Sequence, residues 1–186
     1  MHYGAVKKFD IANGEGIRTT VFVSGCRNRC PGCFQPETWD FTYGAPFTEE
    51  VERSILESVA NPSVRGITVL GGEPMEPENQ EGLLPFLRRF KTEYPTKTVW
   101  LYTGFTYEEL TDPDLGARCL TPLTREILSL ADILVEGRFV EEKKRLGLRF
   151  RGSENQRIID MALTREQGAP VIWEGCRLDK NYGETK

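Results

Sequence analysis

A β-branched and aromatic run that ends in clustered cysteines decides which fold this chain can form. Residues 19–33 read TTVFVSGCRNRCPGC. Its opening, TTVFVS, has the composition of a buried β-strand, because β-branched and aromatic side chains pack well on a pleated surface. The thiols of Cys26, Cys30 and Cys33 follow directly on one short loop. The sequence therefore predicts a strand that carries three thiols at its carboxyl end.

Short apolar stretches alternate with amphipathic ones through the rest of the chain. Further strands are expected over residues 66–70, 97–102 and 132–136, with weaker signals at 157–161 and 171–173. Helices are expected over residues 48–60, 79–94 and 122–130. This alternation indicates βαβ units, a mostly parallel sheet and hence an α/β fold. A closed eight-fold barrel needs about 250 residues, so a chain of 186 residues favours a partial (β/α)6-type barrel that stays open.

Threonine and proline residues mark the expected helix boundaries. Thr48 is a suitable N-cap for the first helix. Pro85 falls inside the second helix and should kink it or mark its true start, because proline removes a backbone donor. For the third helix, Thr121 is expected to be the cap and Pro122 the first helical residue.

Length and composition exclude several classes of protein. With 39% hydrophobic and 28% charged residues, the chain has the make-up of one globular domain over residues 1–186. Its net charge of −4 disfavours direct binding of nucleic acid, which needs phosphate-neutralising cations. No apolar run approaches the roughly 20 residues that span a membrane. The first ten residues also lack the apolar core of a signal peptide. A cytoplasmic location without membrane contact is therefore expected.

The number and spacing of the cysteines point to a metal centre. Three of the five cysteines lie on one polar loop, which disfavours a packed core of unliganded thiols. A structural zinc site would need a second pair of cysteines, and none is present. The only histidine, His2, looks unsuited as a ligand, and Cys119 and Cys176 lie far away and are expected to be ordinary thiols. A 4Fe–4S cluster held by three cysteines leaves one iron open to substrate.

Other distinctive residues also follow expected strands. Gly71-Gly72-Glu73-Pro74 comes after the second strand, Thr103-Gly104 after the third and Gly137 after the fourth. In parallel α/β folds the carboxyl ends of the strands share one edge, where ligands bind. These loops are therefore expected to converge with the cysteine loop on one site.

These residues carry a resemblance to a known family. The C-x3-C-x2-C loop resembles the cluster motif of radical S-adenosylmethionine (SAM) enzymes, and GGEP at 71–74 resembles their SAM-binding glycine motif. The wider context resembles the activating proteins of anaerobic (class III) ribonucleoside-triphosphate reductases over about residues 3–160. The matching segments are NGEGIR (13–18), FVSGC (22–26), CPGCF (30–34), TW (38–39), DILVEG (132–137) and RGSENQ (151–156), with Trp100 and TGF (103–105).

This resemblance implies a radical SAM core and an oxidoreductase activity. Cys26, Cys30 and Cys33 would hold a 4Fe–4S cluster whose open iron chelates SAM. A donor such as flavodoxin would reduce the cluster, SAM would break into methionine and a 5′-deoxyadenosyl radical, and this radical would abstract hydrogen from a glycine of the reductase large subunit. No catalytic side-chain acid or base is required. The family also suggests a homodimer.

The resemblance assigns SAM contacts residue by residue. Gly71 and Gly72 would let the backbone approach SAM, and their carbonyls and Glu73 would accept hydrogen bonds from its ammonium group. Thr103 is a further candidate contact at a strand end. On their own, both segments could be plain turns.

The adenine contact departs from the general superfamily pattern. Many members carry an aromatic residue just before the third cysteine, where this chain has Gly32, and the aromatic residue here is Phe34 after it. The expected contact is the backbone of Gly32, Cys33 and Phe34.

A basic stretch and the last residues leave alternatives open. The cations are Lys143, Lys144, Arg145, Arg149 and Arg151, and they form a solvated surface, a docking surface for the reductase or a contact with the SAM carboxylate. Residues 162–186 match no motif. The alternative functions are activation of another glycyl radical enzyme, such as pyruvate formate-lyase, and non-catalytic binding of zinc or an iron–sulfur cluster.

Overall fold

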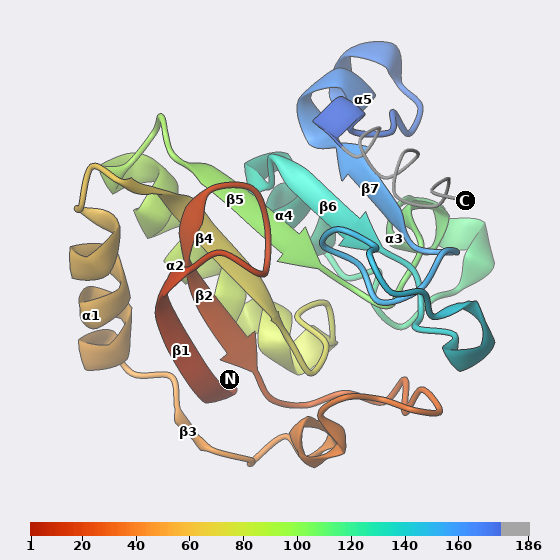
Figure 1. Ribbon diagram of the computed structural model, residues 1–186, viewed down its shortest axis with the longest axis horizontal. Coiled ribbons are helices and arrows are strands. Elements are labelled where there is room, and N and C mark those ends of the chain that lie inside the picture. Colours follow the sequence, from red (N-terminus) through yellow and green to blue (C-terminus); the bar gives the residue numbers. More distant parts are fainter. Residues whose placement is uncertain (176–186) are drawn as a thin grey trace, which may run out of the picture.

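The computed structural model describes residues 1–175 and contains one seven-stranded sheet (Figure 1). The strands are β1 (His2–Asp10), β2 (Ile17–Val23), β3 (Ala45–Pro46), β4 (Val64–Gly71), β5 (Thr98–Tyr102), β6 (Ile133–Glu136) and β7 (Arg157–Asp160). The helices are α1 (Glu49–Val59), α2 (Pro77–Glu93), α3 (Tyr107–Thr111), α4 (Thr124–Leu130) and α5 (Met161–Gln167). Residues 176–186, and with them the expectation for Cys176 and for most of the tail, lie outside the described residues, so the single-domain organisation stays a prediction.

The strand order is β3-β1-β2-β4-β5-β6-β7, and the middle of the sheet is parallel. Strands β2, β4, β5 and β6 run parallel to one another, whereas β1, β3 and β7 pair antiparallel at the two sides. The sheet is not closed, so the predicted mixed α/β fold with an open sheet is confirmed.

The expected number of about six β/α units is wrong. In the described residues α1 joins β2 to β4, α2 joins β4 to β5, and α3 with α4 joins β5 to β6. Strand β7 returns antiparallel because the segment that joins it to β6 has no α-helix to make a parallel crossover. Strand β1 forms a hairpin with β2 and adds another antiparallel neighbour.

Several helix and strand boundaries differ from expectation. Pro85 lies inside α2, which starts at Pro77, so Pro85 does not mark the start of the helix. Helix α4 starts at Thr124, because Thr121 and Pro122 form the turn before it. Residues 171–173 make only an isolated bridge, between Ile172 and Ile159, and not a strand.

The main core lies between one face of the sheet and helices α1, α2 and α4. It contains alternate strand residues, such as Val69 and Leu101, and helix residues, such as Ile55, Leu87 and Ile127, all fully buried. Burying these aliphatic side chains contributes about 1.5–3 kcal/mol each to folding. On the opposite face of the sheet, the packing includes a buried charged side chain.

A buried arginine ties the strands together on that opposite face. Arg18, which is 1% exposed, donates from Nε to the Thr68 hydroxyl over 2.8 Å and from a guanidinium nitrogen to the Thr98 carbonyl over 2.8 Å. Its guanidinium also lies over the Trp100 ring, and burial lowers the pKa of Arg18 to about 10. Gly14, with a φ of +127°, lets the preceding loop lie against Arg18 and Trp100, because a Cβ there would be 2.8 and 2.9 Å from their atoms. These contacts explain the spacing of the NGEGIR segment.

No helix of residues 1–175 combines the length and the apolar character that crossing a membrane would demand.

Candidate functional site

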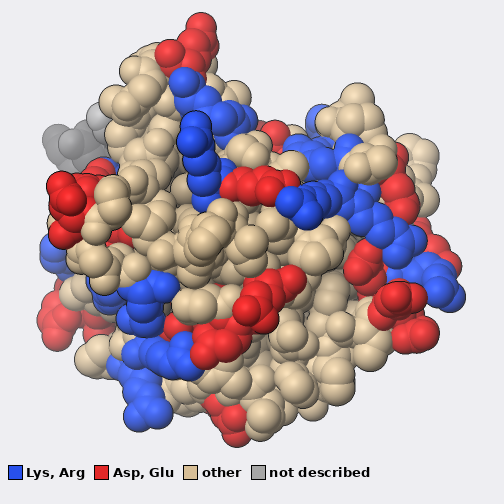
Figure 2. All heavy atoms as spheres, turned by 180° about the vertical axis from the view of Figure 1, so that it is seen from behind, with Lys and Arg blue, Asp and Glu red and all other residues tan. Residues whose placement is uncertain are grey.

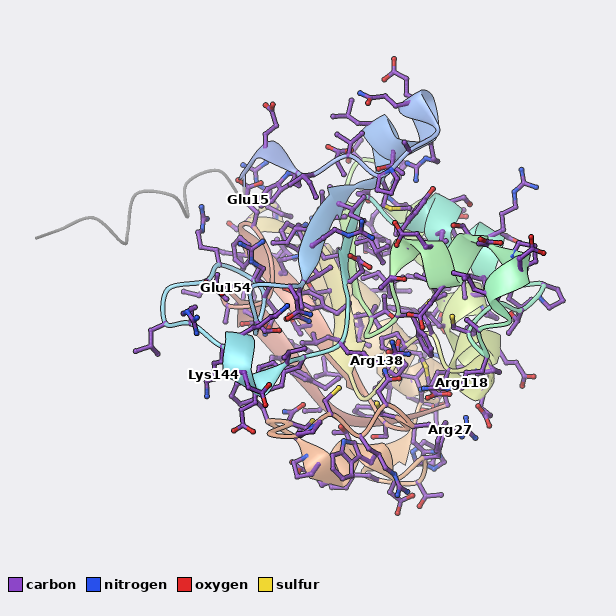
Figure 3. The ribbon with its side chains drawn as sticks, turned by 90° about the vertical axis from the view of Figure 1, so that its right-hand side faces the viewer. Glu15, Arg27, Arg118, Arg138, Lys144 and Glu154 are labelled. Carbon is purple, nitrogen blue, oxygen red and sulfur yellow. The ribbon has the colours of Figure 1, made fainter. Side chains whose placement is uncertain are left out.

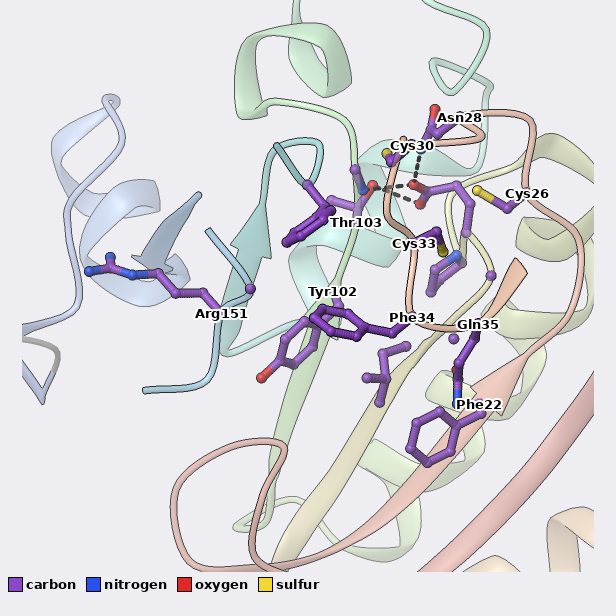
Figure 4. Close-up of a pocket in the computed structure, with 18 of the residues that line it drawn as sticks. Phe22, Cys26, Asn28, Cys30, Cys33, Phe34, Gln35, Tyr102, Thr103 and Arg151 are labelled. Carbon is purple, nitrogen blue, oxygen red and sulfur yellow. Dashed lines mark hydrogen bonds between the residues drawn. The ribbon is translucent and has the colours of Figure 1, made fainter. Parts of the chain in front are cut away.

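One cavity of about 570 Å³ lies at the carboxyl ends of the parallel strands (Figure 4). Loops that follow β2, β4, β5 and β6 all line it, as the strand pattern predicts. The lining includes Cys26, Cys30, Cys33, Phe34, Gly71, Gly72, Glu73, Thr103, Gly104 and Gly137. The prediction that these loops converge on one site is therefore confirmed.

The three thiols of the cysteine loop are free. Cys26 is buried, and Cys30 and Cys33 are partly exposed. Burial raises the pKa of the Cys26 thiol to about 11, so binding of a metal there would release a proton. Within residues 1–175, no three His, Cys, Asp or Glu side chains already stand grouped around a metal position.

The donor set of the cavity suits an iron–sulfur cluster with one open position. Thiolates are the usual protein ligands of such clusters, and the described lining offers three of them and no histidine. His2 lies in β1 and does not line the cavity. Cys119 is fully buried outside the lining, and its thiol donates to the Glu109 carbonyl. The indole Nε1 of Trp39, another lining residue, is buried without a described protein partner.

Two glycines allow the loop after β4 to lie directly on the loop after β2. The Gly72 N–H donates to the Val23 carbonyl over 2.7 Å, and the Glu73 N–H donates to the Gly25 carbonyl over 2.8 Å. A Cβ on Gly71, whose φ is +115°, would lie 2.5 Å from the Val23 oxygen. A Cβ on Gly72 would lie 2.7 Å from the Gly25 oxygen. Both positions therefore exclude any larger residue.

The carboxylate of Glu73 is enclosed by protein donors. It is 1% exposed and accepts from Thr103 Oγ1 over 2.7 Å, from the Gly104 N–H over 2.7 Å, from Asn28 Nδ2 over 2.9 Å and from the Met75 N–H over 2.9 Å. Burial raises the pKa of Glu73 to about 7, although these bonds favour the ionised form. Glu73 thus ties three loops of the cavity to one another.

A second buried carboxylate anchors the cysteine loop from the other side. Glu76, with a side chain that is 0% exposed, accepts from the Arg27 N–H over 2.8 Å and forms ion pairs with Arg27 and Arg118, both over 2.9 Å. Arg118 also donates to Asn28 Oδ1 over 2.7 Å. Burial raises the pKa of Glu76, but the arginine hydrogen bonds outweigh it and hold the pKa below its ordinary value.

This network contains residues that the sequence does not single out. Arg27 and Asn28 stand between the first two cysteines, and Glu76 stands two residues after the GGEP segment, so their positions were a usable signal. No feature of the sequence pointed to Arg118, because only the fold brings the segment before α4 to the cysteine loop. Figure 3 shows Arg27 and Arg118 close together beside that loop.

The segment between β6 and β7 packs against the cysteine loop. Phe34 is 66% exposed, but one side of its ring faces Phe139, with 5.3 Å between centroids. Lys144 Nζ lies 4.7 Å from the centroid of the same ring. A Cβ on Gly32, whose φ is +69°, would lie 2.7 Å from the Glu141 carboxyl carbon. Gly32 therefore leaves room for this contact.

The predicted basic stretch does not enter the cavity as a whole. Arg151 is a lining residue, and in Figure 4 its guanidinium points away from the cysteines. Lys143, Lys144 and Arg145 are exposed. On the face shown in Figure 2, lysine and arginine side chains lie beside aspartate and glutamate side chains.

Comparison with known proteins agrees with the chemistry of the cavity. The family model described as "4Fe-4S single cluster domain" matches residues 12–159. A protein of Pasteurella multocida (strain Pm70) is 41% identical over 158 residues, which are 84% of this chain and 95% of the relative. A protein of Escherichia coli (strain K12) is 35% identical, with 84% and 96% covered. One of Enterobacteria phage T4 is 29% identical, with 85% and 93% covered.

All three relatives carry the name anaerobic ribonucleoside-triphosphate reductase-activating protein. The resemblance found in the sequence motifs is thereby confirmed. This chain belongs to the 4Fe–4S single cluster domain family and, within it, to the anaerobic ribonucleoside-triphosphate reductase-activating proteins.

Proposed function

We propose that this protein is a radical SAM enzyme that installs a glycyl radical on an anaerobic ribonucleoside-triphosphate reductase. The observation that carries the proposal is the meeting of three thiols and two close-packed glycines around one cavity at the strand ends. The names of the relatives support the reductase as the target rather than pyruvate formate-lyase. The open parallel sheet suits a radical SAM core of the partial-barrel kind.

The proposed cofactors are a 4Fe–4S cluster on Cys26, Cys30 and Cys33, and SAM beside it. When bound, the reduced cluster would supply one electron that breaks SAM into methionine and a 5′-deoxyadenosyl radical, which takes a hydrogen atom from a reductase glycine. The chain's own residues bind and orient the reactants and keep water away. The aromatic side chains of Phe34, Phe139 and Phe150, which line the cavity, suit that exclusion.

The backbone of the GGEP loop is the proposed site for the SAM ammonium group. The Glu73 carboxylate already accepts hydrogen bonds from four donors, so the carbonyls of Gly71 and Gly72 are the better acceptors. Thr103 donates to Glu73 and accepts from the Phe105 N–H, so its contribution would be to position Glu73. For adenine, Cys33 and Phe34 line the cavity, whereas Gly32 precedes them without being a lining residue, so the backbone of Cys33 and Phe34 is the proposed contact.

Three further expectations belong to the proposal. A one-electron donor of the flavodoxin type would reduce the cluster, and the protein would act as a homodimer. A cytoplasmic location is favoured because free thiols persist in a reducing compartment.

Anaerobic reconstitution tests the proposal against its alternatives. The protein is loaded with iron and sulfide, reduced with dithionite and given SAM in the absence of any reductase. We expect about four irons per chain and release of methionine with 5′-deoxyadenosine. Tight binding of zinc, or a cluster that leaves SAM intact, would reject the proposal in favour of a non-catalytic metal protein.

A further inference from the structure

The segment that joins β6 to β7, residues 137–156, presents a basic tip from a fixed base. At the base, Gln156 Nε2 donates to the Gly137 carbonyl over 2.9 Å, and Asn155 Nδ2 donates to the Arg138 carbonyl over 2.9 Å. The Glu154 N–H donates to the Lys143 carbonyl over 2.9 Å. The RGSENQ segment thus fastens the two ends of the loop, so the tip has a defined position.

The tip carries positive charge that is only partly paired with carboxylates in the described residues. Residues 143–151 read KKRLGLRFR and contain no acid. Arg145 pairs with Glu154 over 3.4 Å. In the described part of the chain, no carboxylate pairs with Lys143, Lys144 or Arg149. This local excess stands out in a protein of net charge −4.

The same tip exposes an apolar side chain. Leu146 is 99% exposed, and residues 141–147 are all exposed. A lone exposed leucine is unremarkable by itself. Here it lies next to Lys143 and Lys144, which pair with no carboxylate of the described residues, and on the segment whose Phe139 lines the cavity and whose Lys144 contacts the lining residue Phe34. A protein substrate must approach this part of the surface for its glycine to reach the cavity.

We infer that residues 143–149 are the docking surface for the reductase. The region of the reductase that they contact is acidic and contains an apolar pocket that accepts Leu146. This inference rests on the proposed function, which supplies the need for a protein partner. Charge complementarity would steer the two proteins together, and Leu146 would lengthen the life of the complex. A second copy of this chain, itself acidic overall, is the competing occupant.

Two substitutions test the surface without touching the cavity. Leu146→Asp replaces a side chain that contacts solvent only, and Lys143→Glu reverses an unpaired charge. The matched controls are Leu163→Asp on α5 and Arg125→Glu on α4, both outside the segment 137–156. The measurements are the Kd and the association rate with the anaerobic reductase at several salt concentrations. Each variant is also assayed for SAM cleavage by dithionite without reductase.

Leu146→Asp should weaken the complex at least about tenfold, as expected for an anchor side chain. Lys143→Glu should slow association several-fold and reduce its dependence on salt. Both variants should keep their SAM cleavage within about twofold of wild type, and the controls should bind normally. Unchanged reductase binding in both variants would overturn the inference. Variants that lose self-association but still bind the reductase would overturn it as well. If wild type binds the reductase through this surface but never cleaves SAM, the proposed function fails and the docking surface stands.

Discussion

Replacing Arg118 by leucine tests whether the buried ion pairs hold the cysteine loop in place. Arg118 Nε lies 3.2 and 3.1 Å from the two carboxylate oxygens of Glu76, and a second nitrogen lies 2.9 Å from one of them. The Glu76 side chain is 0% exposed, so water cannot replace the lost donors. The substitution also removes the donor to Asn28 on the cysteine loop.

The size of the effect follows from burial. Removing one partner of a buried ion pair costs about 3–5 kcal/mol when the other charge is left uncompensated. Here Arg27 remains on Glu76, and the Arg118 side chain is itself 36% exposed. We therefore expect a loss just below that range, about 2–3 kcal/mol of unfolding free energy, or about 5–10 °C in melting temperature for a chain of this size.

The assay is thermal and urea unfolding of the metal-free protein under reducing conditions. Arg88→Leu is the matched control, because Arg88 makes a similar two-point contact with Glu126, but both side chains are exposed. Exposed pairs contribute little, so this control should melt like wild type. Equal stability losses in the two variants would refute the role given to burial.

The pH dependence provides a second check on the same pair. The pKa of Glu76 in the folded protein lies below its ordinary value, so its stabilising effect is complete above the unfolded pKa of about 4.3. The effect disappears as the pH falls through the lower folded pKa. The difference between wild type and Arg118→Leu should therefore be largest near neutral pH and shrink below about pH 4. A difference that grows in acid would contradict this sign.

Four further substitutions separate the roles of the other site residues. Cys119→Ala should keep the full iron content after reconstitution, whereas Cys30→Ala should lose most of it, and iron analysis decides between them. Gly72→Ala should bind iron but lose most of its affinity for SAM, measured by equilibrium binding, because its Cβ would meet two backbone oxygens at 2.7 and 2.9 Å. Thr103→Val should lower the unfolding free energy by about 1–3 kcal/mol, because it removes one of the four donors to the buried Glu73 carboxylate, and urea unfolding measures the loss.

The parallel centre of the fold could be predicted from residues that alternate between apolar runs and amphipathic helices. Strands β2, β4, β5 and β6 each coincide with a β-branched run. Strand β1 could not be seen this way, because Lys7, Lys8 and Gly4 interrupt its apolar pattern and none of its residues is buried. The antiparallel return of β7 depends on a loop whose path is set by tertiary contacts.

The part of the candidate site that consists of motifs at strand ends could be predicted from the sequence. The cysteines, GGEP and Thr103-Gly104 all reach the cavity because parallel strands end at one edge. Arg118 is the counterexample, because its partner Glu76 is distant in sequence and nothing near Arg118 marks it. Long-range ion pairs of this kind become apparent only when the chain is folded.

Electron paramagnetic resonance on the reductase is the most direct test of the central claim. The reconstituted protein, SAM and a reductant are incubated anaerobically with the anaerobic ribonucleoside-triphosphate reductase, and in parallel with pyruvate formate-lyase. We expect a glycyl radical signal on the reductase only, which narrows when the reductase contains α-deuterated glycine. The absence of that signal from a reductase that binds the protein, while SAM is cleaved, would contradict the account.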